Sequence, residues 1–268
     1  MNLCRDIQDV NLMNEIVAQQ KQDMAKLLKN NQRLCIVLFD EDEKLFAPEK
    51  EALLKIARYR IDGILEMMPQ IEIKDIVLNG GMASYIYNEY TDIDVAVLVD
   101  FDEKVISRQD FRLLLKRINK ANYAKNYHFK LLNRSVDCFF MNDLHQGSGL
   151  YSLQNDCWIT KPVYREFSFS IDEFFDAYRL YSIKIHEDID CFEKLNSRFL
   201  SLHGCEQLEK YLFELKEKAL NAKVSSPEQE YCMACQFYRC AALFGVLNHF
   251  QDYLAESYRF NLRNEIEV

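Results

Sequence analysis

The chain has 268 residues, of which 49% are hydrophobic and 28% are charged, a balance typical of a globular protein that can bury a sizeable core. Its 33 basic and 42 acidic residues give a formal net charge of −9. This charge argues against broad, non-specific binding of duplex DNA, which depends on clustered Lys and Arg. No apolar run reaches the ~18 residues of a membrane span, so no membrane association is expected.

The nine cysteines form an odd number and show no tight spacing of the kind found in small disulfide frameworks. The start, Met1-Asn-Leu-Cys4, has no basic region followed by an apolar core, so no signal peptide is recognised. Both observations favour a cytoplasmic protein whose thiols are reduced and mostly buried.

Helices and strands are expected to alternate in the first part of the chain. Pro48 occupies the favoured first position of a helix that Pro69 ends, and apolar residues recur between them at helical spacing. The segment 34–39 is either a short strand or a buried plug. Helices are expected over 11–31, 48–68 and 110–125. Strands are expected over 72–79, 92–100, 127–132, 135–141 and 157–160. The strands over 127–132 and 135–141 are expected to form a hairpin around Asn133-Arg134.

After Pro162 glycine nearly vanishes and helical periodicity takes over. Ser170-Ile-Asp-Glu173 is a capping box that opens a helix towards Leu195, and a second helix is expected over 206–223. Ser226-Pro-Glu-Gln229 predicts another start, for a helix reaching about Tyr258. The chain is therefore expected to comprise an α/β domain over 1–165, with an N-terminal helical extension, and an α-helical domain over 166–268.

Three aspartates are the candidate catalytic and metal-binding residues. Asp92 and Asp94 alternate with Ile93 and Val95 at a strand period, so both carboxylates should share one face, ~7 Å apart along the strand. Asp137 lies in a strand otherwise too apolar to hold an exposed acid, so its presence requires a reason. Carboxylate oxygens are the ligands that Mg²⁺ prefers, and phosphoryl transfer commonly uses two metal ions.

A glycine pair precedes the first two aspartates. Gly80-Gly81 would let backbone amides approach a phosphate without side-chain interference, and a following helix N-terminus would favour the anion. Ser84 could add a hydroxyl donor. Gly80, Gly81 and Ser84 are therefore the candidate phosphate-binding residues. Taken alone, the glycine pair fits a simple turn better than a phosphate site, and the two aspartates fit a solvated strand face as well as a metal site.

At these residues the chain resembles the polymerase-beta-type nucleotidyltransferase superfamily, in which a strand ending in Gly-Gly or Gly-Ser precedes Asp-x-Asp and a later third carboxylate. It further resembles a phage and bacterial group of predicted nucleotidyltransferases. The resemblance covers roughly residues 45–165, and Gly81 and Asp137 depart from it where Ser and Glu are frequent. Similar segments are Glu51–Ala57, Lys74–Gly81, Thr91–Val95, Tyr127–Phe129, Val136–Phe140, His145–Ser152 and Trp158–Pro162.

This resemblance implies a small mixed sheet backed by helices, and transfer of a nucleoside monophosphate from a nucleoside triphosphate to an acceptor hydroxyl. It implies Mg²⁺ or Mn²⁺ held by Asp92, Asp94 and Asp137, and ATP or another triphosphate as substrate. The acceptor is left open among a small molecule, a protein and RNA. Two other classes remain: an inactive nucleotide-binding or antitoxin-like module, and a helical RNase-type domain with a regulatory nucleotidyltransferase fold.

The remaining polar and sulfur residues are expected mainly to have structural roles. His128 and His145 are expected to be structural partners, and Lys161 a surface group that could meet a triphosphate. Cys232-Met-Ala-Cys235 with Cys240 resembles half a zinc site but fits core cysteines better. Arg198 and His203 fit a short pattern of helical RNases. Tyr151, Ser152 and Trp158 are expected to pack the sheet edge or shape a pocket.

Overall fold

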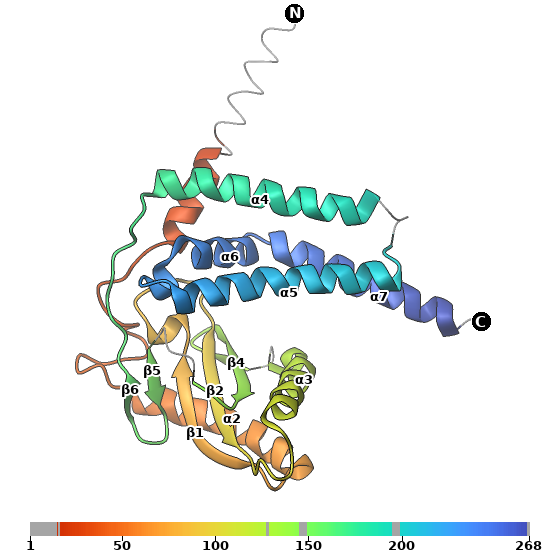
Figure 1. Cartoon of the computed structure of the whole chain (residues 1–268). Helices are drawn as coiled ribbons and strands as arrows, with labels where there is room; N and C mark the ends of the chain where they lie inside the picture. The colour runs from red at the N-terminus through yellow and green to blue at the C-terminus, as the bar shows by residue number, and fades with distance from the viewer. Residues whose placement is uncertain (1–14, 16, 127–128, 145–148, 195–198, 267–268) are drawn as a thin grey trace, which may run out of the picture. The chain divides into compact units, whose positions relative to one another are not determined.

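A computed structural model of the chain describes residues 15, 17–126, 129–144, 149–194 and 199–266 (Figure 1). Two compact units divide the chain: residues 29–164 form one, and residues 165–268 with residues 1–28 form the other. No helix among the described residues is both long enough and apolar enough to cross a membrane.

The first unit is built on a six-stranded mixed sheet, which confirms the expected combination of helices and a small mixed sheet. The strand order is β3-β4-β2-β1-β5-β6. β2 and β4 pair in parallel, whereas the other neighbours pair antiparallel. The strands are β1 Glu72–Asn79, β2 Ile93–Asp100, β3 Lys130–Leu131, β4 Arg134–Met141, β5 Leu150–Ser152 and β6 Cys157–Thr160.

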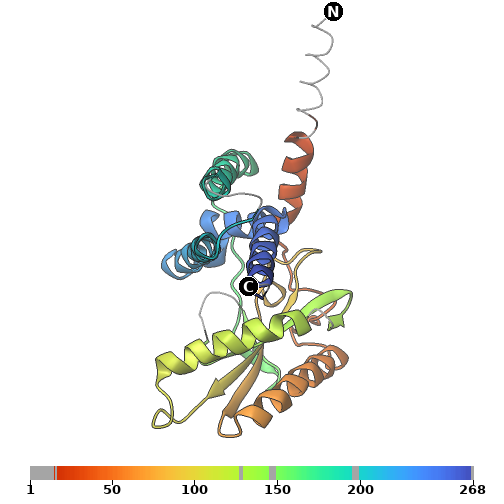
Figure 2. The same ribbon diagram turned by 90° about the vertical axis from the view of Figure 1, so that its right-hand side faces the viewer.

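Helices α2 (Ala47–Met67) and α3 (Arg108–Asn126) pack against this sheet. In Figure 2 they run alongside the strands, α2 in orange and α3 in yellow-green. Alternate residues of β2, such as Val95 and Val97, join the same buried cluster as side chains from both helices. The opposite face of β2 carries Asp94 and Asp100 together with Ala96 and Leu98.

Two short segments differ in detail from their predictions. Residues 34–39 form a partly buried loop and not a strand: Leu38 and Phe39 are buried, Ile36 and Val37 are exposed, and Phe39 alone makes a β-bridge, to Leu45. The turn between β3 and β4 lies at Leu132 and Asn133, one residue earlier than expected, and both residues have positive φ. β5 has three residues and was not predicted; it is too short to show a period.

The second unit is helical, with α4 (Ile171–Lys194), α5 (Leu202–Ser225), α6 (Met233–Leu243) and α7 (Val246–Ile266). Figure 1 shows α4, α5 and α6 running alongside one another. The capping box of α4 is confirmed: the Ser170 amide donates to Glu173 Oε2 at 2.8 Å, and the Glu173 amide donates to Ser170 Oγ at 3.2 Å.

The predicted helix over 226–258 is helical over most of its range, but its start is wrong and it is divided into α6 and α7. Ser226 ends α5 as its C-cap, and Pro227 follows a helix end, a position as typical of proline as a helix start. A short 3₁₀ helix (Gln229–Tyr231) then precedes α6. Gly245, at a φ of +79°, separates α6 from α7 in the left-handed conformation that commonly ends a helix.

The N-terminal helical residues 17–27 pack with the second unit, whereas the sequence joined them to the first. Met24 and Leu27 are 3% and 4% exposed and belong to the same apolar cluster as Phe174 and Leu208. Tertiary packing against the helices of the second unit therefore sets the partner of this segment.

Candidate metal centre and active site

Strand register brings Asp94 and Asp137 together. β2 and β4 run parallel, with Ile93 opposite Val136 and Asp94 opposite Asp137. Ile93 and Val136 are fully buried, so the next residue on each strand points to the other face of the sheet. Both aspartates are half-buried there, in strands whose apolar alternation fixes which face each side chain takes.

Asp92 completes the group from the residue immediately before β2. One carboxylate oxygen from each of Asp92, Asp94 and Asp137 lies within 4.8 Å of the other two. Within the described part of the chain, these three aspartates are the His, Cys, Asp or Glu side chains that converge closely enough to hold a metal ion. Three hard oxygen donors at this spacing fit a divalent cation such as Mg²⁺ or Mn²⁺.

The pKa of the Asp137 carboxyl group reflects its place in the acidic cluster. Burial raises its pKa above the usual value for an aspartate, and the nearby Asp92 carboxylate raises the pKa further. A group of acids that disfavour one another's ionised form is an arrangement that a bound cation relieves. The same raised pKa makes the Asp137 carboxylate a better proton acceptor than an ordinary aspartate.

Gly80 is placed directly against Asp94. Its φ of 71° and ψ of −159° lie in a region that is open essentially only to glycine. A Cβ added at this position would lie 1.9 Å from Asp94 Oδ2. Asn79, the last residue of β1, pairs with Asp94 across the sheet. The glycine therefore lets the backbone turn over the carboxylate without contact from a side chain.

Gly81 and Ser84 build the turn that follows. A Cβ at Gly81 would lie 2.7 Å from Thr91 Cγ2, so this position also requires a small residue. The Ser84 hydroxyl is fully buried, donates to the Gly81 carbonyl at 3.0 Å and accepts from the Ile86 amide at 3.3 Å. These bonds give Ser84 a role in shaping the turn, and its direct contact with a phosphate stays a prediction.

The expected helix after the glycine pair is only a three-residue 3₁₀ turn, Gly81–Ala83. Gly149, in the loop before β5, packs against the end of that turn, where an added Cβ would lie 1.9 Å from the Ala83 carbonyl oxygen. Gly149 and the turn that follows the glycine pair are thus adjacent in space. Any approach to phosphate at this turn rests on backbone amides and not on a helix N-terminus.

Arg134 was missed by the sequence reasoning and supports the site from behind. Its Nη1 donates to the carbonyl oxygens of Asn88 at 2.7 Å and Thr91 at 2.6 Å. The Asn88 amide in turn donates to Thr91 Oγ1 at 2.9 Å. The guanidinium therefore fixes the segment that delivers Asp92. An arginine in a hairpin turn carries no sequence signal for this role, because the bonded carbonyls are more than 40 residues away.

The residues expected at the sheet edge are accounted for by packing. Tyr151 is fully buried and its hydroxyl donates to Asp156 Oδ1 at 2.8 Å. The Ser152 hydroxyl donates to Asp75 Oδ1 at 2.9 Å, and Trp158 Nε1 donates to the Glu43 carbonyl at 2.9 Å. Lys161 forms an ion pair with Glu43 at 2.5 Å. His128 and His145 lie outside the described residues.

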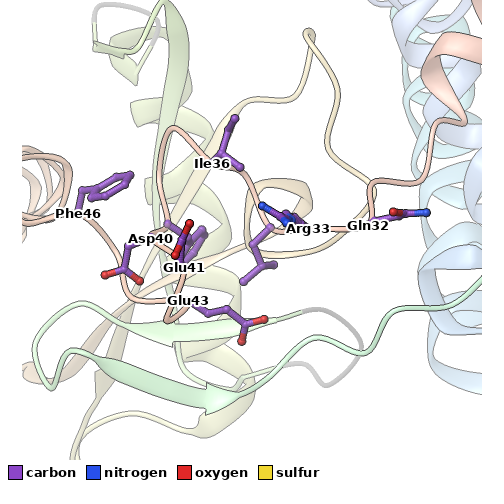
Figure 3. A pocket seen from close by; sticks show the side chains of 9 residues that line it. Gln32, Arg33, Ile36, Asp40, Glu41, Glu43 and Phe46 are labelled. Carbon is purple, nitrogen blue, oxygen red and sulfur yellow. The ribbon is translucent and has the colours of Figure 1, made fainter.

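A hollow of about 660 Å³ lies in the loop before α2 (Figure 3). The loop is tied to the segment after the glycine turn, because Asn31 Nδ2 donates to the Tyr87 carbonyl at 2.6 Å. No predicted site residue lines the hollow. Its lining residues are Gln32, Arg33, Leu34, Ile36, Phe39, Asp40, Glu41, Glu43 and Phe46.

The structure gives no support to the helical RNase pattern. Arg198 lies outside the described residues, and His203 is an exposed residue of α5 whose ring is hydrogen-bonded to Gln207 Nε2 at 2.9 Å. Cys232 and Cys235 do lie in contact, and Cys240 is fully buried in the apolar cluster of the helical unit.

Comparison of the chain with protein-family models, with curated proteins and with solved structures found no match in any of the three. The candidate site is therefore judged on its own geometry.

Proposed function

We propose that the chain is a metal-dependent nucleotidyltransferase, which moves a nucleoside monophosphate from a nucleoside triphosphate to an acceptor hydroxyl and releases pyrophosphate. One observation supports this most: three carboxylates from β2, β4 and the residue before β2 converge beside a glycine turn that only glycine can form. Uncharged side chains would pack at the three aspartate positions at less cost, and the glycine turn leaves backbone amides free of side chains beside the carboxylates.

The donor set suits one or two divalent ions, because Asp92, Asp94 and Asp137 offer only oxygen ligands and none of them is fully buried. A bound ion would neutralise phosphate oxygens and make the acceptor hydroxyl more acidic. Asp92 and Asp94 would hold it from adjoining positions. The backbone amides of Gly80 and Gly81 would hold the β- and γ-phosphates, since no side chain blocks their approach.

Asp137 would take the proton of the acceptor hydroxyl. The acceptor oxygen forms a bond to the α-phosphorus of the triphosphate, and the bond from that phosphorus to the bridging oxygen breaks, so that pyrophosphate leaves. Burial raises the pKa of Asp137, which makes its carboxylate a stronger base than an ordinary aspartate. In the Asp137→Asn variant the proton acceptor is lost while the size of the side chain is kept.

Metal binding tests the first part of the proposal. Titration of the protein with Mn²⁺, followed by electron paramagnetic resonance, should show Asp92→Asn, Asp94→Asn and Asp137→Asn each raising the dissociation constant at least about tenfold, or roughly 1.4 kcal/mol. Asp100→Asn is the matched control, because Asp100 is an exposed aspartate at the other end of β2. Equal Mn²⁺ affinity in all five proteins would sink the proposal.

Turnover tests the second part and separates the alternatives. The protein is incubated with Mg²⁺, each of four labelled triphosphates in turn, and the small-molecule, protein and RNA fractions of a cell extract. Label transferred by the parent and not by Asp94→Asn is the expected result, and the labelled fraction gives the acceptor class. Binding of Mg²⁺ and triphosphate without any transfer would support instead the inactive nucleotide-binding or antitoxin-like module.

A further inference from the structure

Two cysteines meet where α6 begins. Cys232 ends the 3₁₀ helix Gln229–Tyr231 and is the N-cap residue of α6, and Cys235 lies in the first turn of α6. Cys232 is 6% exposed and Cys235 is half-buried. The Cys-x-x-Cys spacing therefore coincides with a helix N-terminus of an 11-residue helix, and the two thiols lie on the same side of its first turn.

The sulfur atoms are already close to bonding distance. Cys232 Sγ and Cys235 Sγ are 3.1 Å apart, whereas a disulfide bond is about 2.05 Å long, so closure needs a shift of about 1 Å. The Cys235 thiol also donates to the Ala219 carbonyl of α5 at 3.2 Å. This hydrogen bond holds the Cys235 thiol beside α5, while the residue as a whole stays partly exposed.

A metal site does not explain the pair. Within the described ranges, no third His, Cys, Asp or Glu converges on these two sulfurs, since the group that does converge consists of aspartates in the other unit. Apolar packing does not explain it either, because Cys235 is partly exposed and uses its thiol as a donor. Two thiols in contact, one of them reachable from solvent, are the arrangement of a dithiol that exchanges with disulfides.

We propose that Cys232 and Cys235 form a reversible dithiol–disulfide site whose substrate is a small disulfide such as glutathione disulfide. This site is independent of the nucleotidyltransferase proposal. The half-buried Cys235 thiolate attacks one sulfur of glutathione disulfide, which forms a mixed disulfide and releases one glutathione. The Cys232 thiolate then attacks Cys235 Sγ and releases the second glutathione. Two protein thiols are oxidised, one disulfide is reduced, and the two thiol protons end on the two glutathiones.

The surroundings of the pair bear on the rate of this exchange. Burial first, and then the hydrogen bond with Cys232, raise the pKa of Cys235 to about 12. Lys223 on α5 lowers this pKa and Glu230 on the 3₁₀ helix raises it, and these two residues form an ion pair of their own at 3.6 Å. Little thiolate is present near neutral pH, so exchange is expected to take hours and is best followed to equilibrium.

Peptide mapping of the native full chain gives a direct test. Trypsin releases residues 224–239, between Lys223 and Arg239, and this peptide contains Cys232 and Cys235 and no other cysteine. The protein is equilibrated in buffers of increasing glutathione disulfide content, quenched with iodoacetamide and digested. The expected product is a peptide that lacks two hydrogens and carries no alkyl group, and dithiothreitol should restore the doubly alkylated form.

Three comparisons make the result decisive. Exposed Cys157 serves as an internal control, because it should form only a glutathione adduct. Cys232→Ser should convert the closed peptide into one with glutathione on Cys235. In urea-unfolded protein the equilibrium constant for closure should fall at least about tenfold, because the fold no longer holds the sulfurs together.

The proposal is overturned if the native peptide stays doubly alkylated at ratios where Cys157 is fully glutathionylated. It is equally overturned if native and unfolded protein close to the same extent. Should Cys232→Ser fail to fold, as circular dichroism would reveal, the comparison of native with unfolded parent protein still decides.

Discussion

At the level of single residues, the contact between Gly80 and Asp94 is the most exacting feature of the molecule. The glycine backbone combines a conformation that other residues avoid with an approach to the carboxylate that leaves no room for a methyl group. Substitution would therefore act on stability through the backbone and on the site through Asp94. The two effects can be separated.

Gly80→Ala is expected to lower the free energy of unfolding by more than the ~1–2 kcal/mol of an unfavourable backbone conformation alone, since Asp94 must also move. It should also weaken Mn²⁺ binding. Gly245→Ala shares the positive φ but meets nothing within 4 Å, and Gly63→Ala lies in α2 with open space around it. Urea unfolding should show moderate loss for Gly245→Ala and none for Gly63→Ala, with unchanged Mn²⁺ affinity in both. Similar Mn²⁺ affinity in Gly80→Ala would contradict this reading.

Asp156 predicts a pH dependence of stability. Its hydrogen bond to Lys50, at 2.9 Å, lowers its pKa below the ordinary value of 3.8, and the Tyr151 hydroxyl bonded to it acts in the same direction. Because the folded-state pKa lies below the unfolded one, the stabilisation is complete above the ordinary pKa and is lost as pH falls through the folded-state value.

Asp156→Asn should therefore lower the free energy of unfolding by about 0.5–1 kcal/mol near pH 7, a figure that allows for solvent screening of a partly exposed pair. Asparagine tolerates the positive φ of this position, so the backbone is not disturbed. The difference from the parent should shrink in urea unfolding near pH 3. A difference of the same size at both pH values would show that the ion pair is not its source. Exposed Asp42→Asn is the control.

Sequence patterns predicted the parts of the site that depend on local periodicity. The alternation around Asp94 gave its face of the sheet, and the odd acid in an apolar strand indicated Asp137. The patterns could not give the parallel register that sets these two side by side, because β2 and β4 are separated by α3 and a hairpin. They also could not show that the Ser84 hydroxyl is used within its own turn, or that Arg134 reaches back to Asn88.

At the level of elements, the hairpin of β3 and β4 does more than supply Asp137, because Arg134, the first residue of β4, holds the segment before β2. Helix ends show the limits of local signals in the same way. Ser170 opens α4 as its capping box predicted, whereas the similar Ser226 closes α5. What distinguishes the two is the preceding chain, which is not helical before Ser170 and already helical before Ser226.

Arg134→Gln removes a donor that bonds two backbone carbonyls, and a glutamine side chain is too short to serve both. The expected result is a loss of about 1–3 kcal/mol in the free energy of unfolding. We also expect a rise of about tenfold in the Mn²⁺ dissociation constant, because Asp92 is no longer held. Lys130→Gln, an exposed change on β3, is the matched control. If Mn²⁺ affinity survives in Arg134→Gln, the segment before β2 is held by other contacts.

At the level of the whole molecule, the chain forms two units, and the N-terminal helical segment belongs with the distant C-terminal helices. This N-terminal segment is therefore expected to stabilise the helical unit and not the sheet unit. Composition alone could place a boundary near 162–170, where glycine disappears, but it could not assign a solitary amphipathic helix to either unit.

Leu27→Ala tests this assignment. Leu27 is 4% exposed within the helical cluster, and its truncation should cost about 2–5 kcal/mol of stability in that unit. Hydrogen exchange followed by mass spectrometry should become faster in peptides from α4 to α7 and stay unchanged in peptides from β1 to β4. Gln20→Ala, on the exposed side of the same helix, should change neither. Faster exchange in the sheet peptides would contradict the assignment.

The parallel pairing of β2 with β4 also bears on how this chain can tolerate change in length. Insertions between the two strands, in the loops around α3, leave the partner of Asp94 unaltered, because the register is set by the strands themselves. A single-residue insertion within β4 before Asp137 would instead turn its carboxylate to the buried face and bring Val136 or the inserted residue into its place. The site can thus survive considerable remodelling of the intervening chain, yet is lost in one step by the smallest shift of a strand.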